Sequence, residues 1–473
     1  MKLRNYQIES IKLLRKSFAD GNQNIILALP TGSGKTVIFS EMVRLAFERG
    51  TKTLILTDRI ELFKATIASV LNHNVPIQEL NAKTKIINAD AMITVAMVET
   101  FKRRDIVQYQ PQLIICDEAH KGNFTPIIKK YTDAKIIGVT ATPIGLHISK
   151  LYKDIIQPID TPELVQQGYL SKCIAYQMQD DFSDLEEIAG EYSEQSQFKH
   201  YNQSKLYLGV VTEWKRYGHN KKTIVFNVNI EHTEKMNQEF VSAGIDARFI
   251  TSNTPHEQRQ QILTDYSNGL FPVLNNCGIL TTGYDEPSIE VVIMNRKTKS
   301  LPLFLQCLGR GSRIYPDKPH FTVLDFGMNH NEHGMWNEDR RWTLAEKKKK
   351  SKDLNAPLVK TCEGCGAMVS IKCGACEYCG FVFPVVKNEP SVGVMIAVKP
   401  TEYNVKGKKI SQLCLDELLY LERIKRYKSS FIWRIIRSKN MIREYARLKG
   451  YSEGWIWRQN RELNNSQYND YTL

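Results

Sequence analysis

The sequence lacks any apolar run that approaches the roughly 18–20 residues needed to cross a bilayer. Residues 1–17 have an amphipathic helix pattern in which polar residues interrupt every apolar stretch, so we do not expect a signal peptide. Acidic residues are fewer than basic ones, 51 against 64, which gives the 473-residue chain a formal charge of +13. That excess favours a polyanionic partner, but charge alone does not separate DNA from RNA or a membrane surface.

The cysteines lack the even spread of a disulfide framework. Of the ten, five crowd into 18 residues and the other five are scattered singly. That distribution indicates a metal site in a reducing compartment rather than a secreted, cross-linked protein. We therefore expect a cytoplasmic protein with no membrane partner.

Short β-rich runs alternate with helical periodicity through two similar-sized parts of the chain, which predicts an α/β fold with parallel sheets and flanking helices. The first series of runs is 25–29, 53–57, 92–96, 113–116 and 135–140, and the second is 223–227, 247–251, 272–275, 291–294 and 321–326. An acidic stretch, residues 179–205, is expected to form a variable loop or short helices. The predicted parts are two α/β domains (1–165 and 166–339), a basic linker (340–359), a cysteine-rich module (360–386) and a basic, aromatic, helical C-terminal region (387–473).

A phosphate-binding loop is predicted between the first β-run and a helix pattern, and it consists of Pro30, Thr31, Gly32, Ser33, Gly34, Lys35 and Thr36. Its glycines permit the tight curvature that turns backbone N–H groups towards phosphate oxygens. Lys35 is expected to contact the β- and γ-phosphates, and Thr36 to ligate Mg²⁺. The usual first glycine is replaced by Leu29, and a chance Gly-Lys-Thr in a loop is the alternative. The strand–loop–helix context favours the phosphate loop.

Two adjacent acids, Asp117 and Glu118, follow a buried β-run. Because carboxyl ends of parallel strands meet at one edge of a sheet, both acids are expected beside the phosphate loop. Asp117 would hold Mg²⁺ through water, and Glu118 would polarise the attacking water. Such acids are often only solvated turn residues, but the upstream phosphate loop favours the catalytic interpretation.

With these motifs in order, residues 1–335 resemble the superfamily 2 helicases of the DEAD/DEAH-box type, which implies two tandem RecA-like domains. The segments that carry the resemblance are 4–7, 57–62, 117–120, 140–143, 281–287 and 306–313. The resemblance implies that Arg4 and Gln7 recognise adenine and that Asp285 contacts the ribose. It also implies that Gln306 orients water, while Arg310 and Arg313 reach the γ-phosphate as arginine fingers.

Five residues in or beside these motifs also have a plainer structural interpretation. The spacing of Arg310 and Arg313 would put both on one helical face, where a solvated basic surface is the alternative. His120 couples the acids to the second domain or caps the local turn. Cys116 and Cys307 are most simply small buried residues.

Within the superfamily, segments 280–285, 306–313 and 323–327 and the cysteine-rich module most resemble the RadD-type DNA repair helicases and phage branch-migration helicases. This resemblance implies a role in DNA repair or recombination, inside a bacterial or phage-infected cytoplasm. Replication or recombination proteins would then be the protein partners.

Two Cys-x-x-Cys-Gly knuckles, Cys362/Cys365 and Cys376/Cys379, are separated by ten residues. Four thiolates at this spacing can enclose Zn²⁺ tetrahedrally, so the sequence predicts a structural zinc ribbon. Cys373 is the alternative to Cys379 as the fourth ligand. An iron–sulfur cluster or a set of redox-active thiols is the alternative to zinc. The ribbon either binds DNA or only stabilises a small module.

The C-terminal residues 401–473 carry 15 Lys and Arg against 8 Asp and Glu, a net +7, with aromatic residues interleaved. Basic side chains can follow a phosphate backbone while aromatics stack on bases, although a helical core with a solvated basic face is the alternative.

The motifs and the resemblance together lead us to expect a DNA helicase or translocase that uses ATP, Mg²⁺ and Zn²⁺ and acts on single-stranded, forked or branched DNA. An RNA helicase, a restriction-type translocase without strand separation and an ATP-gated DNA-binding scaffold are the rivals.

Overall fold

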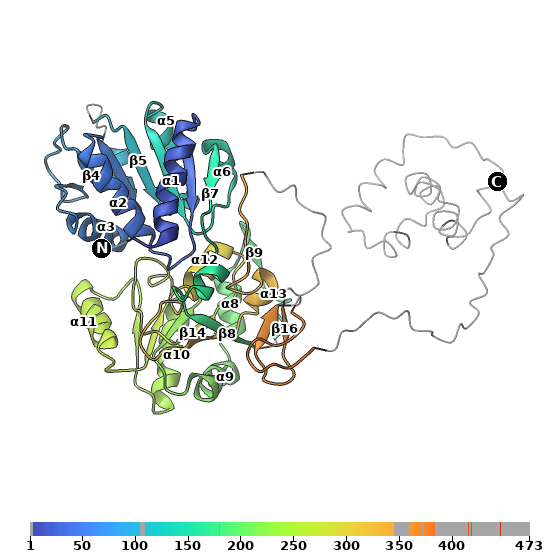
Figure 1. Cartoon of the computed structure of the whole chain (residues 1–473). Coiled ribbons are helices and arrows are strands. Elements are labelled where there is room, and N and C mark those ends of the chain that lie inside the picture. The colour runs from blue at the N-terminus through green and yellow to red at the C-terminus, as the bar shows by residue number, and fades with distance from the viewer. Residues whose placement is uncertain are drawn as a thin grey trace, which may run out of the picture. The chain divides into compact units, whose positions relative to one another are not determined.

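The computed structural model of the protein describes residues 3–104, 109–178, 180–344, 359–370 and 373–383, together with Leu415, Leu418 and Tyr445. Residues 1–385 form one compact unit and residues 386–473 another. The first unit contains two α/β lobes, drawn in blue to cyan and in green to orange in Figure 1. The prediction of an α/β fold with parallel sheets is confirmed.

The first lobe is a parallel sheet of seven strands in the order β3-β4-β2-β5-β6-β1-β7. Its elements are α1 (Asn5–Ala19), β1 (Asn24–Ala28), α2 (Lys35–Glu48), β2 (Thr53–Thr57), α3 (Ile60–Leu71), β3 (Gln78–Leu80), β4 (Ile93–Met97), α4 (Val98–Arg103), β5 (Leu113–Asp117), a 3₁₀ turn (Ala119–Lys121), α5 (Thr125–Lys130), β6 (Lys135–Thr140), α6 (Leu146–Leu151), β7 (Asp154–Ile156) and α7 (Thr161–Gln166). Alternate residues of β1 enter two cores, with Ile25 and Leu27 on one face and Ile26 on the other. Burial on both faces explains why the strands read as continuous apolar runs.

The second lobe is an eight-stranded sheet in the order β12-β13-β11-β14-β15-β8-β17-β16. Its elements are β8 (Lys172–Gln177), β9 (Glu187–Ile188), β10 (Glu191–Tyr192), α8 (Glu194–Tyr201), α9 (Ser204–Glu213), a π-helical turn (Trp214–Gly218), β11 (Thr223–Asn227), α10 (Ile230–Ser242), β12 (Ala247–Ile250), α11 (His256–Ser267), β13 (Val273–Asn276), β14 (Val291–Asn295), α12 (Leu301–Leu308), β15 (His320–Asp325), α13 (Asn329–His333), β16 (Val359–Thr361) and β17 (Met368–Ser370). Helices α9 and α10 pack on one face, and α11 and α12 on the other. The latter core continues into the first lobe.

Part of the acidic stretch 179–205 forms a β-hairpin instead of a loop or helix. Strands β9 and β10 pair antiparallel across Ala189 and Gly190, which both have positive φ. Two-residue strands with acidic side chains give no period-2 signal, which is why the sequence did not reveal them. The short helix α8 follows, as expected.

The cysteine-rich module is attached to the second sheet. Strand β17 pairs antiparallel with β8 through Met368 and Ala175, and the Tyr378 hydroxyl donates to the Cys173 carbonyl at 2.5 Å. The module therefore covers the edge of that sheet, whose backbone groups would otherwise be free to pair with another chain.

The predicted linker 340–359 is not wholly a linker, because Trp342 and Leu344 pack against the first lobe. Residues 345–358, which include the lysine run, lie outside the described residues, as does the predicted helical C-terminal region apart from three single positions. Among the residues that the structure describes, none of the helices has the length and apolar content needed to cross a membrane.

Candidate functional site

A cavity of about 530 Å³ lies between the two lobes and gathers most of the predicted site residues. The first lobe contributes Arg4, Gln7, Thr31, Gly32, Gly34, Lys35, Thr36, Asp117 and Glu118, and the second contributes Gly283, Tyr284, Asp285, Gln306, Arg310 and Arg313. Pro30 lines a smaller cavity nearby, and Ser33 is buried in the loop. Residues more than 270 positions apart therefore share one site.

The predicted phosphate loop joins β1 to α2. Gly32 and Gly34 have φ of 90° and 77°, and Gly34 is the N-cap of the helix that begins at Lys35. A non-glycine residue would be strained at either position. The helix directs the positive end of its dipole and its unpaired N–H groups into the cavity, which suits an anionic ligand. Burial lowers the pKa of Lys35, and the carboxylates of Glu118 and Asp117 oppose that effect.

The two acids leave the carboxyl end of β5, where the parallel sheet was expected to put them. Burial raises the pKa of Asp117, the adjacent Glu118 carboxylate adds to the rise, and Lys35 opposes it. Such a crowded, buried pair of carboxylates suits a site that receives a divalent cation.

His120 has partners only in the first lobe among the contacts described. Its Nδ1 lies 2.9 Å from Thr140 Oγ1 and 3.3 Å from Glu118 Oε2. The imidazole thus joins the acidic pair to the segment 140–143. Coupling to the second domain stays a prediction.

The helical spacing argument for Arg310 and Arg313 was wrong, because α12 ends at Leu308. Both arginines lie in the turn that follows, where Gly309 and Gly311 make a continued helix unfavourable. Arg310 donates to the carbonyl oxygens of Thr281, at 2.9 Å, and Tyr284. Arg313 Nε donates to Asp285 Oδ1 at 2.7 Å. The two guanidinium groups still line the cavity, but the turn and the loop 281–285 hold them there.

Three donors of the second lobe are left over in this arrangement. Gln306 Nε2, Arg310 Nε and Arg313 Nη1 are buried and have no hydrogen-bond partner in the described part of the chain. Buried donors without acceptors are unfavourable, so their presence beside a cavity indicates a ligand that supplies acceptors. Two of the three belong to cations, which favours an anionic ligand.

The predicted adenine end of the cavity is partly occupied by the protein's own contacts. Gln7 Oε1 accepts from the Arg4 backbone N–H at 2.9 Å, and Gln7 Nε2 donates to the Ser33 carbonyl at 3.4 Å. The Arg4 guanidinium lies 4.2 Å from the centre of the Tyr169 ring. Tyr169 belongs to no motif and is brought beside Arg4 and Tyr6 only by the fold, so it had no sequence signal.

The lobes approach closely at three glycines. A Cβ at Gly283 would lie 2.7 Å from Glu61 Cβ of the first lobe, and a Cβ at Gly32 or Gly309 would collide with Arg313 or Thr31 of the opposite lobe. The interface is therefore shaped for closed lobes, and it leaves no room for side chains at these positions.

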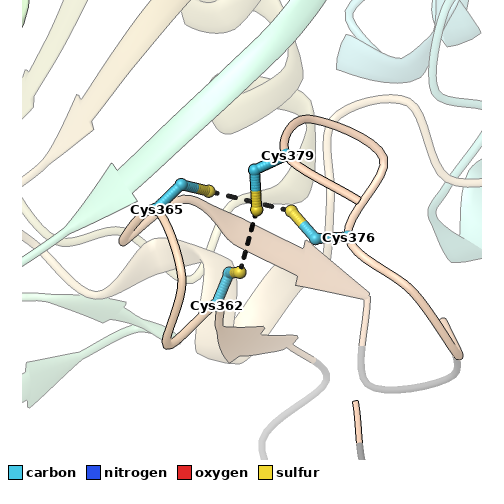
Figure 2. Close-up of side chains that lie close together, drawn as sticks. All are labelled: Cys362, Cys365, Cys376 and Cys379. Carbon is cyan, nitrogen blue, oxygen red and sulfur yellow. Dashed lines mark hydrogen bonds between the residues drawn. The ribbon is translucent and has the colours of Figure 1, made fainter. Parts of the chain in front are cut away.

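The four knuckle cysteines converge on one point, as Figure 2 shows. Their sulfur atoms lie within 4.8 Å of one another, with 3.6 Å between Cys362 and Cys379 and 3.7 Å between Cys365 and Cys376. A tetrahedral ZnS₄ centre with Zn–S of about 2.3 Å requires sulfur atoms about 3.8 Å apart. Cys373 is outside this group. The four thiols are therefore gathered as the ligands of a structural zinc ion would be.

The two cysteines that lie within or beside the helicase-like motifs are buried core residues. Cys116 and Cys307 are fully buried, and burial raises the pKa of both thiols. They are unreactive core residues, as expected.

Two known protein families match the chain, one in each of its two α/β lobes. Residues 1–145 match the family described as "Type III restriction enzyme, res subunit", and residues 206–315 match the "Helicase conserved C-terminal domain". A 51.5 kDa protein of Lactococcus phage (isolate 7-9) is 31% identical over 365 residues, which cover 75% of this chain and 77% of the phage protein. The Saccharomyces cerevisiae protein named "Putative ATP-dependent helicase IRC3" is 29% identical over 359 residues, covering 68% of this chain and 51% of the yeast protein. The chain thus spans about half the length of the yeast relative.

Solved structures share the fold. A fragment described as a putative HsdR subunit of a type I restriction enzyme from Vibrio vulnificus has a TM-score of 0.55 at 20% identity, covering 68% of this chain and 64% of that one. The type ISP restriction-modification enzyme LlaBIII bound to DNA has a TM-score of 0.51 at 16% identity, covering 68% and 27%. At these identities the likeness concerns the fold alone, which is a pair of RecA-like lobes.

The matched families define a nucleic-acid-dependent ATPase built from two lobes. The chain belongs to the superfamily 2 helicases.

Proposed function

We propose that this helicase is a DNA motor that uses ATP and Mg²⁺ to translocate on, and separate, the strands of forked or branched DNA. The observation that carries the motor part is the interlobe cavity, in which buried cationic donors of the second lobe face the phosphate loop and acids of the first. A site split between two lobes can turn over only when the lobes are together, so ligand binding and lobe movement must be coupled.

In this proposal, Lys35 and the N-terminus of α2 bind the phosphates, while Thr36 and Asp117 hold Mg²⁺. Mg²⁺ held by these two residues would supply neutralisation of the phosphate charge. Glu118 accepts a proton from the attacking water, which Gln306 orients. Arg310 and Arg313 stabilise the charge that develops on the transferred phosphoryl group.

At the other end of the cavity, Arg4 and Gln7 are assigned to the adenine and Asp285 to the ribose. The contacts of Gln7 with Arg4 and Ser33 hold its amide at the cavity wall. Adenine recognition through that amide requires either an exchange of partners or use of its remaining lone pair and N–H.

DNA is favoured as the track for two reasons. The type ISP restriction-modification enzyme LlaBIII, which shares the fold, was solved bound to DNA, and two Escherichia coli relatives are named type I restriction enzyme endonuclease subunits. The chain's positive charge is concentrated in residues 401–473, where aromatic side chains suitable for base stacking are interleaved. The DEAH-box, repair, recombination and branch-migration assignments follow from the RadD-type resemblance and belong to this proposal.

A restriction-type translocase that moves on duplex DNA without unwinding it is the second candidate. It is favoured by the family match of residues 1–145 and by the shared fold of the Vibrio fragment. The two candidates differ in product, because only a helicase releases single strands.

An unwinding assay separates the candidates. Fluorescently labelled linear duplex, fork and four-way DNA, and an RNA duplex, are incubated with the full chain and ATP, with Lys35→Ala as the inactive control. Strand release from fork or four-way DNA supports the proposal, whereas displacement of a triplex-forming strand without duplex separation supports the translocase. Activity on RNA alone would reassign the substrate.

A further inference from the structure

A segment that no helicase motif includes connects the second lobe back to the first. Residues 335–344, here called the strap, follow α13 and run past β7 of the first lobe (Figure 1). The strap contains two tryptophans, Trp336 and Trp342, and a partly buried arginine, Arg340. Each makes contacts that a solvated linker would not make.

The beginning of the strap is fixed to the second lobe. Trp336 is 2% exposed, and its ring centre lies 5.3 Å from that of Phe321 on β15. Arg340 donates to four carbonyl oxygens, those of His333, Met335, Trp336 and Glu338, at 2.7–3.3 Å. Four acceptors on one guanidinium group hold these residues in a single rigid turn.

The end of the strap is fixed to the first lobe. Trp342 and Leu344 pack against the core that lies under α4, α5 and α6. The side chain of Gln157, directly after β7, forms hydrogen bonds with the strap backbone on both sides of Arg341. Its Nε2 donates to the Arg340 carbonyl at 2.9 Å, and its Oε1 accepts from the Trp342 N–H at 3.1 Å.

Between these two ends the strap lines a cavity together with residues of the phosphate loop and of α12. A small cavity there is lined by Pro30 and Thr31 of the phosphate loop, Leu305 of α12, and Trp336 and Trp342 of the strap. Helix α12 also carries Gln306. One segment thus borders the loop that binds phosphate and the helix that faces it from the other lobe.

We propose that the strap is a tether that limits how far the lobes separate and so keeps the phosphate loop and α12 in register between turnovers. A covalent connection anchored on both lobes raises the effective concentration of one lobe at the other. Gln157 and Trp342 are accordingly positioning residues for ATP turnover. The turnover part rests on the proposed function, whereas the tether itself does not.

The test uses full-length Gln157→Ala and Trp342→Ala, with Trp342→Phe as the conservative variant. Arg341→Ala is the matched control, since Arg341 lies in the same strap and its side chain is 89% exposed. Small-angle scattering without nucleotide should show a larger maximum dimension for the two alanine variants than for wild type and the control. With DNA present, the KM for ATP should rise about tenfold in Gln157→Ala, as expected for two lost hydrogen bonds, while kcat stays within about twofold.

Several outcomes decide the matter. Equal scattering and equal KM in wild type and Gln157→Ala would overturn the tether. A lower melting temperature in Trp342→Ala that Trp342→Phe does not restore, without a change in scattering, would make Trp342 a core residue only and would also count against it. Because scattering needs neither ATP nor DNA, a wild-type chain without ATPase activity would contradict the proposed function and leave the tether testable.

Discussion

Replacing Arg313 by alanine should abolish most ATP turnover while leaving the fold intact. Arg313 Nη1 is buried beside Gly32 of the phosphate loop and has no hydrogen-bond partner among the described residues, while Arg313 Nε donates to Asp285. An arginine that reaches the transferred phosphoryl group contributes about 10³–10⁵ in kcat. Since the side chain of Arg313 is still 24% exposed, we expect the low end of that range, a loss of about 10³.

Stability should change little in the same variant. The carboxylate partner, Asp285, is 67% exposed, so the ion pair contributes at most about 1 kcal/mol. Loss of the charge should raise the KM for ATP only a few-fold, because Lys35 and the phosphate loop remain.

Steady-state ATP hydrolysis at saturating DNA measures the loss, and a fluorescent nucleotide measures binding. Arg248→Ala is the matched control, since Arg248 pairs with Asp265 in the same lobe and neither residue lines the cavity. Arg313→Lys should recover only a small part of kcat, because a point charge does not replace the planar fork. If Arg313→Ala kept kcat within threefold of wild type, the assigned role would be wrong.

Three further predictions concern the acids, the cysteines and a buried histidine. Glu118→Gln should bind ATP normally but hydrolyse it at least about 10²-fold more slowly, measured by single-turnover kinetics; an unchanged rate would exclude it as the base. Metal analysis of the wild type should find about one zinc per chain, and Cys376→Ser should lose that zinc and have a lower unfolding midpoint, whereas Cys373→Ser should change neither. Iron in the wild type would refute the zinc assignment. Burial lowers the pKa of His232 to about 3, so the unfolded chain binds a proton below its ordinary pKa of 6.5 and the folded chain does not. Stability should therefore be lost as pH falls, by about 2 kcal/mol between pH 6.5 and 5, and His232→Asn should remove that slope in urea unfolding.

The central strands of both sheets were predictable, because burial on two faces leaves continuous apolar runs. Runs such as 53–57, 135–140 and 223–227 coincide with β2, β6 and β11. Strands were missed where they lie away from the sheet centres or carry polar residues, and their pairing depends on distant neighbours. In the two large sheets these are β3, β7, β8, β16 and β17.

The site was predictable as a set of residues but not as a geometry. The resemblance to the helicases implied that Gln306, Arg310 and Arg313 would face the phosphate site, yet the expected placement of both arginines on one helical face was wrong. A turn stabilised by hydrogen bonds from Arg310 to the Thr281 and Tyr284 carbonyls directs these side chains into the cavity, and such contacts have no local sequence signal. The contacts of the strap could not be predicted for the same reason, since Gln157 and Trp342 are 185 residues apart in the sequence.

The central claim is that a nucleic-acid track controls turnover in the interlobe site. The most direct test is the ATPase rate of the full chain without nucleic acid and with single-stranded, forked and four-way DNA. We predict stimulation by DNA, greatest with the fork or four-way junction, and its loss in Lys35→Ala. An ATPase rate that no nucleic acid changes would contradict the motor mechanism.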